Sequence, residues 1–278
     1  SINDAGSTLD EKIIVDATKF FETGQKTELH YSVKNTDRTI GAKLSSVMYH
    51  KFKDTNINDD QLTLNLEGSA GQSLGAFAVK GLSIKVEGDA NDYVGKSLSG
   101  AKIIIRPHKN SRLNTNENTI IGNTCMYGST SGSLFASGQA GERFAVRNSG
   151  ATAVVEGCGS NGCEYMTGGN IIILGPTGDN FGAGMTGGMA FVYDNDEKFK
   201  HRVNEETLIF DKIQSKHWEN VLKEFIDKHV NETGSKHARL ILDDWDTEKL
   251  KFIQICPKEI IHTLEHPLSE DLKKQTLQ

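Results

Sequence analysis

The chain has 278 residues, of which 36% are hydrophobic and 24% charged, and its formal net charge is −6. These values indicate a folded chain of one large or two ordinary domains and argue against a nucleic-acid-binding surface. No apolar run approaches the ~18 residues of a membrane helix, and no segment is organised as a signal peptide. We therefore expect no nucleic-acid or membrane partner. Four cysteines in this length favour a reducing compartment over a disulfide framework.

The N-terminal stretch predicts one helix followed by mixed structure. Apolar side chains repeat at helical spacing over Leu9–Thr23, and Gly24 follows as a terminator. Residues 28–66 combine alternating, strand-like segments with a helix near Lys43–Tyr49. Because the chain starts at Ser1 rather than at Met, we expect it to be processed or cut from a longer protein.

Glycine is distributed unevenly, and all but four of the 28 glycines lie between Gly68 and Gly188. In this region a glycine followed by a short apolar strand recurs at six positions, in steps of 19, 32, 18, 19 and 19 residues. The long step contains the polar residues 109–118, which we interpret as an insertion. The six positions form a predicted structural glycine ladder: Gly81, Gly100, Gly132, Gly150, Gly169 and Gly188.

A repeat of about 19 residues restricts the choice of fold. It is too short for a helical-hairpin repeat or a propeller blade. It suits one coil of a parallel β-helix, in which strands stack at ~4.8 Å and glycines occupy sharp corners and close backbone contacts. The sequence lacks the rhythm of a left-handed hexapeptide helix and the Gly-Gly-x-Gly-x-Asp of a calcium-binding one. We predict a mainly β chain, a parallel β-helix solenoid with α-helical caps at both ends.

The C-terminal stretch returns to helical patterning. Helices are predicted over Ser215–Val230 and near His237–Trp245, and Leu250–Ile255 is compatible with a strand. Helices at the ends of a solenoid cover exposed strand edges. The expected organisation is an N-terminal helical and mixed cap (residues 1–67), a glycine-rich β-helix (residues 68–198) and a C-terminal helical cap (residues 199–278).

Cys158 and Cys163 are the most suggestive pair for metal binding. Their four-residue spacing differs from the Cys-x2-Cys of zinc ribbons, no second pair answers it, and only Cys125 and His108 could assist. Free cysteines are commonly buried, so a tight corner of small side chains is the favoured interpretation.

The remaining polar motifs are incomplete. A basic cluster in the insertion could hold an anion but is more typical of a solvated loop: Arg106, His108, Lys109 and Arg112. The acidic residues Asp194, Asp196 and Glu197 lack calcium-loop spacing. Residues 175–178 and the pair Gly182 and Gly184 lack the Gly-x4-Gly-Lys-Ser/Thr of phosphate loops.

Carboxylates do not recur at one place in the repeat, as a glycosidase groove would require. The candidates are Glu87, Asp89, Asp92, Glu142, Glu156 and Glu164. We therefore predict no catalytic, cofactor-binding or metal-binding residue in this chain.

Several longer motifs resemble one known family. They are residues 141–151 (GERFAVRNSGA), 164–169 (EYMTGG) and 180–188 (NFGAGMTGG), with residues 38–42, 68–73 and 87–96 upstream and residues 233–235 and 241–245 in the tail. Together they are similar to the C-terminal GXGXG domain of the glutamate synthase large subunit. The resemblance spans nearly the whole chain and implies a right-handed parallel β-helix without catalytic residues of its own.

The resemblance also implies a parent enzyme that makes L-glutamate from L-glutamine and 2-oxoglutarate with electrons from NAD(P)H or ferredoxin. In that family FMN, an iron–sulfur cluster and the amidotransferase and central domains lie upstream, and a small NAD(P)H-oxidising subunit carries FAD. The chain would brace those domains, in the cytoplasm or a plastid stroma. Cys158 and Cys163 do not match the cluster motif, so no ligand role is carried over.

Two alternatives stay open at this stage. The chain also resembles a scaffold subunit of formylmethanofuran dehydrogenase, although the Arg-Asn-Ser-Gly run at residues 147–150 fits glutamate synthase better. A stand-alone β-helix that binds or processes carbohydrate would need a groove of aromatic residues and carboxylates, and only 7% of residues are aromatic. The sequence does not separate a cut domain from a free-standing subunit.

Overall fold

The computed structural model describes residues 7–53 and 57–269. In these residues twelve strands form one sheet in the order β1-β2-β3-β4-β6-β8-β9-β10-β12-β11, with β5 and β7 paired beside this path. The strands are β1 (Thr27–Val33), β2 (Leu62–Ala70), β3 (Leu82–Ala90), β4 (Ser99–Arg106), β5 (Thr119–Ile121), β6 (Ser131–Ala136), β7 (Gln139–Ala140), β8 (Ser149–Val155), β9 (Thr167–Ile173), β10 (Gly187–Tyr193), β11 (Leu208–Lys212) and β12 (Phe252–Pro257).

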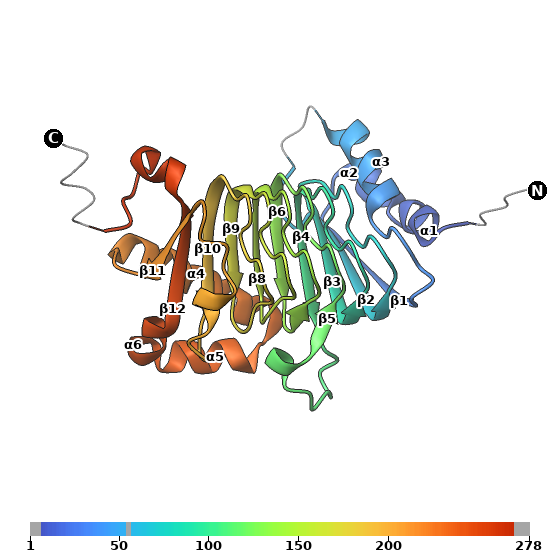
Figure 1. The fold of residues 1–278 in the computed structure, drawn as a ribbon. Helices are drawn as coiled ribbons and strands as arrows, with labels where there is room; N and C mark the ends of the chain where they lie inside the picture. The colour runs from blue at the N-terminus through green and yellow to red at the C-terminus, as the bar shows by residue number, and fades with distance from the viewer. Residues whose placement is uncertain (1–6, 54–56, 270–278) are drawn as a thin grey trace, which may run out of the picture.

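Helices lie at both ends of the sheet and over one of its faces. α1–α3 lie at the β1 end of the sheet, and α6 lies near β12. α4 and α5 lie along one face of the sheet (Figure 1). The α-helices are α1 (Leu9–Asp16), α2 (Thr18–Thr23), α3 (Ala42–Phe52), α4 (Lys216–Thr233), α5 (Lys236–Asp243) and α6 (Trp245–Glu248). The 3-10 helices are η1 (Thr115–Glu117), η2 (Phe199–His201), η3 (Lys249–Lys251) and η4 (Lys258–Thr263).

The sheet is mostly parallel, and the chain as a whole is mixed α/β. Helices account for nearly as large a share of the residues as strands do, so the prediction of a mainly β chain is met only in part. From β1 to β10 each strand of the main path pairs in parallel with the next, whereas β12 runs antiparallel to both β10 and β11. The repeat pattern could not show this antiparallel end, because β11 and β12 lie outside the glycine-rich region.

The predicted helices differ from the observed ones mainly at their ends. The helix predicted over Leu9–Thr23 is two helices, because it breaks at Ala17 between α1 and α2. α3, α4 and α5 correspond to the other three predicted helices, and the strand expected near Leu250 begins at Phe252 as β12. The expected border between residues 67 and 68 falls inside β2, which pairs with β3 along its whole length.

The two faces of the sheet have different partners. On the inner face Leu64, Ile84 and Ile103 lie in register on neighbouring strands and belong to the main core, which the N-terminal helices close with residues such as Phe20. On the outer face one register row runs across eight strands and changes from polar to apolar: His30, Asn65, Lys85, Ile104, Phe135, Val154, Ile172 and Phe191. The apolar part of this row packs under α4 and α5 and forms a second core.

The predicted glycine ladder lies at the starts of the strands, where backbone meets backbone. Five of its six members, all except Gly150, have positive φ. A Cβ on Gly169 would lie 2.2 Å from the carbonyl oxygen of Ala151 on the neighbouring strand, and one on Gly150 would lie 2.2 Å from that of Thr130. At these two positions a side chain would have to displace a backbone carbonyl of the adjacent repeat.

A second set of left-handed residues forms the corner that precedes the ladder glycines. In six successive repeats the residues at positions i, i+2 and i+4 of this corner all have φ between +53° and +73°. They are Ser73, Gly75 and Phe77; Tyr93, Gly95 and Ser97; Thr124, Met126 and Gly128; Arg143, Ala145 and Arg147; Asn161, Cys163 and Tyr165; and Asn180, Gly182 and Gly184. Thirteen of these eighteen residues are not glycine, so glycine spacing alone did not predict the corner.

Gly169→Ala should lower the free energy of unfolding much more than Gly24→Ala. Both glycines have positive φ (+86° and +67°), but nothing lies within 4 Å of a Cβ on Gly24. The control should lose ~1 kcal/mol through backbone conformation alone. Gly169→Ala adds the clash with Ala151 and should lose at least ~3 kcal/mol. Urea denaturation of both variants measures the difference, and equal losses would show that close backbone contact is unimportant at the ladder.

Candidate functional site

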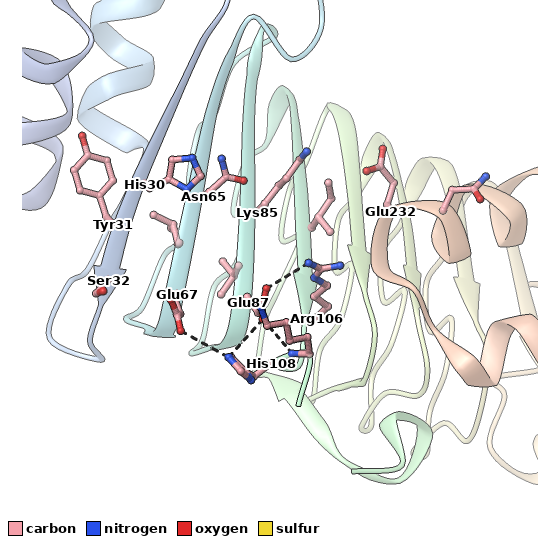
Figure 2. Close-up of a pocket in the computed structure, with 15 residues that line it drawn as sticks. His30, Tyr31, Ser32, Asn65, Glu67, Lys85, Glu87, Arg106, His108 and Glu232 are labelled. Atoms are coloured by element: carbon pink, nitrogen blue, oxygen red, sulfur yellow. Dashed lines mark hydrogen bonds and ion pairs between the residues drawn. The ribbon is translucent and has the colours of Figure 1, made fainter. Parts of the chain in front are cut away.

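A groove crosses the outer face of the sheet beyond the end of its helical cover. Its floor is the polar part of β1–β4, and its sides include Asn231 and Glu232 at the end of α4 and the segment 108–109 after β4 (Figure 2). The groove has a volume of about 610 Å³. It lies on the same face as the second core, so it begins where the outer row stops being apolar.

Glu87 is the centre of the charged residues in the groove. Its Oε1 accepts the backbone N–H of Lys109 at 3.0 Å, and its Oε2 lies 3.3 Å from Nη2 of Arg106. His108 Nε2 is 3.6 Å from Glu87 and 3.8 Å from Glu67. The Lys109 hydrogen bond lowers the pKa of Glu87, and the Arg106 charge adds to this against the opposing effect of burial.

The predicted basic cluster is therefore assembled only in part. Arg106, His108 and Lys109 line the groove, whereas Arg112 is exposed in the loop outside it. The sequence did not show that Glu87, from the preceding strand, would neutralise this cluster. Glu87 and Arg106 are 19 residues apart but directly paired in the register of β3 and β4, so alignment of the repeats would have found them.

The cysteine pair belongs to the interior of the corner. Cys163 is one of the left-handed corner residues, and all four cysteines are free and buried. Burial raises the pKa of Cys158 to about 12 and that of Cys163 well above its ordinary value. Neutral, enclosed thiols are poor metal ligands and nucleophiles. Across the described parts of the chain no group of three His, Cys, Asp or Glu residues has metal-binding geometry.

The carboxylates of the acidic motif bind groups within the same turn, residues 194–202. Asp194 accepts the backbone N–H groups of Lys198 and Phe199, both at 3.1 Å, and Asp196 pairs with Arg202 at 2.9 Å. Burial raises the pKa of Asp194. Burial also acts to raise the pKa of Asp196, but Arg202 and the backbone N–H of Lys198 contribute to lowering it, and the net pKa is lowered. Of the glycine-rich segment, residues 175–177 border the same small cavity of about 270 Å³ as this turn.

Glu156 is the one fully buried carboxylate of those considered from the sequence. It follows β8 on the outer face and accepts hydrogen bonds from Ser235 Oγ at 2.5 Å and from Ser137 Oγ at 3.2 Å. His229 Nε2 on α4 lies 3.2 Å from the same oxygen. Burial alone would raise the pKa of Glu156, but His229 and the hydroxyls hold it below its usual value.

This network fixes the helical cover to the sheet. Ser235 is also the N-cap of α5 and accepts the N–H of Ala238 at 3.0 Å, so one carboxylate joins α4, α5 and two strand ends. A buried carboxylate with several donors is costly to leave unpaired. No local sequence pattern predicts this network, because His229 and Ser235 lie 73 and 79 residues from Glu156 in the chain.

Glu156→Gln should destabilise the chain at neutral pH and weaken its sensitivity to acid. The lowered folded-state pKa means that the Glu156 contribution is fully present above the unfolded-state pKa near 4.5 and is lost as pH falls through the folded-state pKa. We expect a loss of ~3 kcal/mol at pH 7 from the broken buried pair. Below about pH 4.5 the difference from the wild type should shrink, as urea denaturation at several pH values would show.

Glu224→Gln is the matched control for this experiment. Glu224 lies on the same helix α4 but is exposed, and its one ion pair among the described residues is with Lys228. An exposed pair of this kind contributes less than ~1 kcal/mol. If the two variants behave alike, the buried network does not hold the helices on the sheet.

The fold defines a class of protein built on a repetitive, mostly parallel sheet with left-handed corners, helical ends and a polar groove. The GXGXG motif family model matches residues 10–258. The chain therefore belongs to the GXGXG motif family. None of the helices in the described residues is long and apolar enough to cross a membrane.

Three relatives show the extent of the similarity. The glutamate synthase [NADPH] large chain of Azospirillum brasilense is 57% identical over 266 residues, which are 96% of this chain and 18% of the relative. The glutamate synthase [NADH] of Schizosaccharomyces pombe is 44% identical over 97% of this chain and 13% of its own length. The ferredoxin-dependent glutamate synthase of Pyropia yezoensis is 45% identical over 92% of this chain and 17% of its own length. The chain spans less than a fifth of these relatives.

Proposed function

We propose that the chain is a scaffold domain of a glutamate synthase large chain, whose parent makes L-glutamate from L-glutamine and 2-oxoglutarate. The observation that carries this proposal is a match over almost all of this chain to a small part of much longer glutamate synthases. The relatives are named for NADPH, NADH and ferredoxin, yet all match over this region. The region is thus common to enzymes with different electron donors, which suits a bracing role rather than donor recognition.

The chemistry of the described residues supports a role without catalysis. The cofactors of the proposed parent are FMN and an iron–sulfur cluster. FMN needs backbone or side-chain groups that bind its phosphate, and the cluster needs accessible cysteine thiolates. The cysteines here are buried with raised pKa values, and the left-handed corner fixes Cys163, so these residues do not fit a cluster. The cofactors would be held by other parts of the parent, with FAD on a small NAD(P)H-oxidising subunit where one is present.

The structural part of the proposal is a right-handed parallel β-helix between two caps. Strands that pair in chain order and corners that recur every 18 to 20 residues, apart from one insertion, suit one coil per repeat. In this proposal the glycine ladder lets the coils approach, residues 1–67 and 199–278 contribute the caps, and the domain braces the FMN, central and amidotransferase domains of the same chain. The compartment would be the cytoplasm or a plastid stroma.

Exchange of the domain tests the scaffold role. The corresponding region of the Azospirillum brasilense large chain, 57% identical, is replaced by this chain, and glutamine-dependent glutamate synthesis is measured. We expect the chimera to keep its flavin and activity of the same order as the parent, because bracing depends on shape and contacts. A second chimera carrying Gly169→Val should lose both, since its domain cannot stack.

Two results would contradict this proposal. One is an active enzyme from which the region has simply been deleted, because then no brace is needed. The other is a purified, isolated chain that binds FMN or hydrolyses glutamine by itself. The isolated chain should instead unfold cooperatively in urea and show no flavin absorbance.

A further inference from the structure

The polar groove has an unbalanced set of free hydrogen-bonding groups. His30, Asn65 and Lys85 occupy one register row on three adjacent strands, and Figure 2 shows them side by side along the floor. Within residues 7–53 and 57–269 none of these three side chains has a hydrogen-bond or ion-pair partner. Each of them can donate a hydrogen bond, and Lys85 carries a full positive charge.

Two of the three carboxylates that line the groove already have close partners. Glu87 is held by Lys109, Arg106 and His108, and Glu232 is paired with Lys102 at 2.8 Å. The third, Glu67, has within the described residues only the 3.8 Å contact to His108. The row of His30, Asn65 and Lys85 itself carries one ammonium group and no carboxylate, so it suits an occupant that supplies acceptors and negative charge.

The outer row of the sheet changes from apolar to polar where its cover by α4 and α5 ends. From Ile104 to Phe191 the row is apolar and lies under α4 and α5 of this chain. At Lys85 it becomes polar, and α4 ends beside the groove at Glu232. An uncovered sheet face with a polar floor suits a polar segment that docks from elsewhere better than a further apolar helix.

We propose that the groove docks an acidic segment from another part of the longer polypeptide, with carboxylates over His30 and Lys85 and an acceptor over Asn65. This inference rests on the proposed function, which places more than four fifths of the parent outside this chain. His30 and Lys85 are two strand spacings apart, ~10 Å. A polyproline II segment places every third side chain on one face at ~9 Å, so it can present two carboxylates at this distance.

Zero-length cross-linking of the native enzyme tests this inference. A carbodiimide joins an amine to a carboxylate that touches it, and mass spectrometry identifies the residues joined. The intact mass of the enzyme purified from its own source first shows whether the chain lies within a longer polypeptide, which tests the proposed function separately. We then expect Lys85 to be coupled to an Asp or Glu outside these 278 residues.

Charge reversal gives the second measurement. Lys85→Glu should raise the rate of proteolysis at the docked segment about tenfold, because loss of one charge-assisted bond exposes it more often. Lys80→Glu, the same change at an exposed lysine outside the groove, should have no effect. Replacement of the cross-linked carboxylate by Lys should restore protection in the Lys85→Glu enzyme.

Each other outcome overturns the inference. Coupling of Lys85 to a second copy of this chain would identify a self-interface instead. A longer polypeptide in which Lys85 couples to nothing, or only to residues of this chain, would leave the proposed function standing and remove the docking segment. Equal proteolysis of the Lys85→Glu and Lys80→Glu enzymes would do the same.

Discussion

The structure depends on a corner in which the backbone alternates between two conformations while it hydrogen-bonds to the repeats on both sides. Arg143 and Arg147 donate their N–H groups to Ser160 and Glu164 of the following repeat, at 2.8 and 2.9 Å, whereas Ala145 between them donates to Cys125 of the preceding one at 2.9 Å. A left-handed residue costs ~1–2 kcal/mol when it is not glycine. Because alternate residues of the corner donate hydrogen bonds to neighbouring repeats, the strain is offset only when the repeats are stacked, and folding of one repeat favours folding of the next.

The sequence predicted the repeat and its period because glycine reports both of the constraints that act at the strand starts, close contact and positive φ. It did not predict the corner, where left-handed residues include Met126, Arg143 and Tyr165. At those positions inter-repeat hydrogen bonds impose the conformation on residues that would not choose it. Local propensity therefore carries no signal there, and only alignment of one repeat on the next would reveal the position.

The groove and the buried Glu156 network were harder to predict for a different reason. Each depends on residues that meet only when separate strands and helices pack together. Alternating patterns indicated which side chains face outward on β1 and β2, but not that His30 and Asn65 would lie beside Lys85. The binding of α4 by Glu156 involves a helix from the far end of the chain, which no local pattern connects to β8.

The residue types on the two faces of the sheet are therefore determined by different contacts. Inner residues must fill a fixed space between stacked repeats, so Leu64, Ile84 and Ile103 are all aliphatic. Outer residues meet no such demand, and their character follows whatever covers them. Where this chain supplies the cover, the row is apolar; where it does not, the row consists of the polar residues His30, Asn65 and Lys85. A sheet face that no part of the same chain covers carries polar side chains, as this row does from His30 to Lys85.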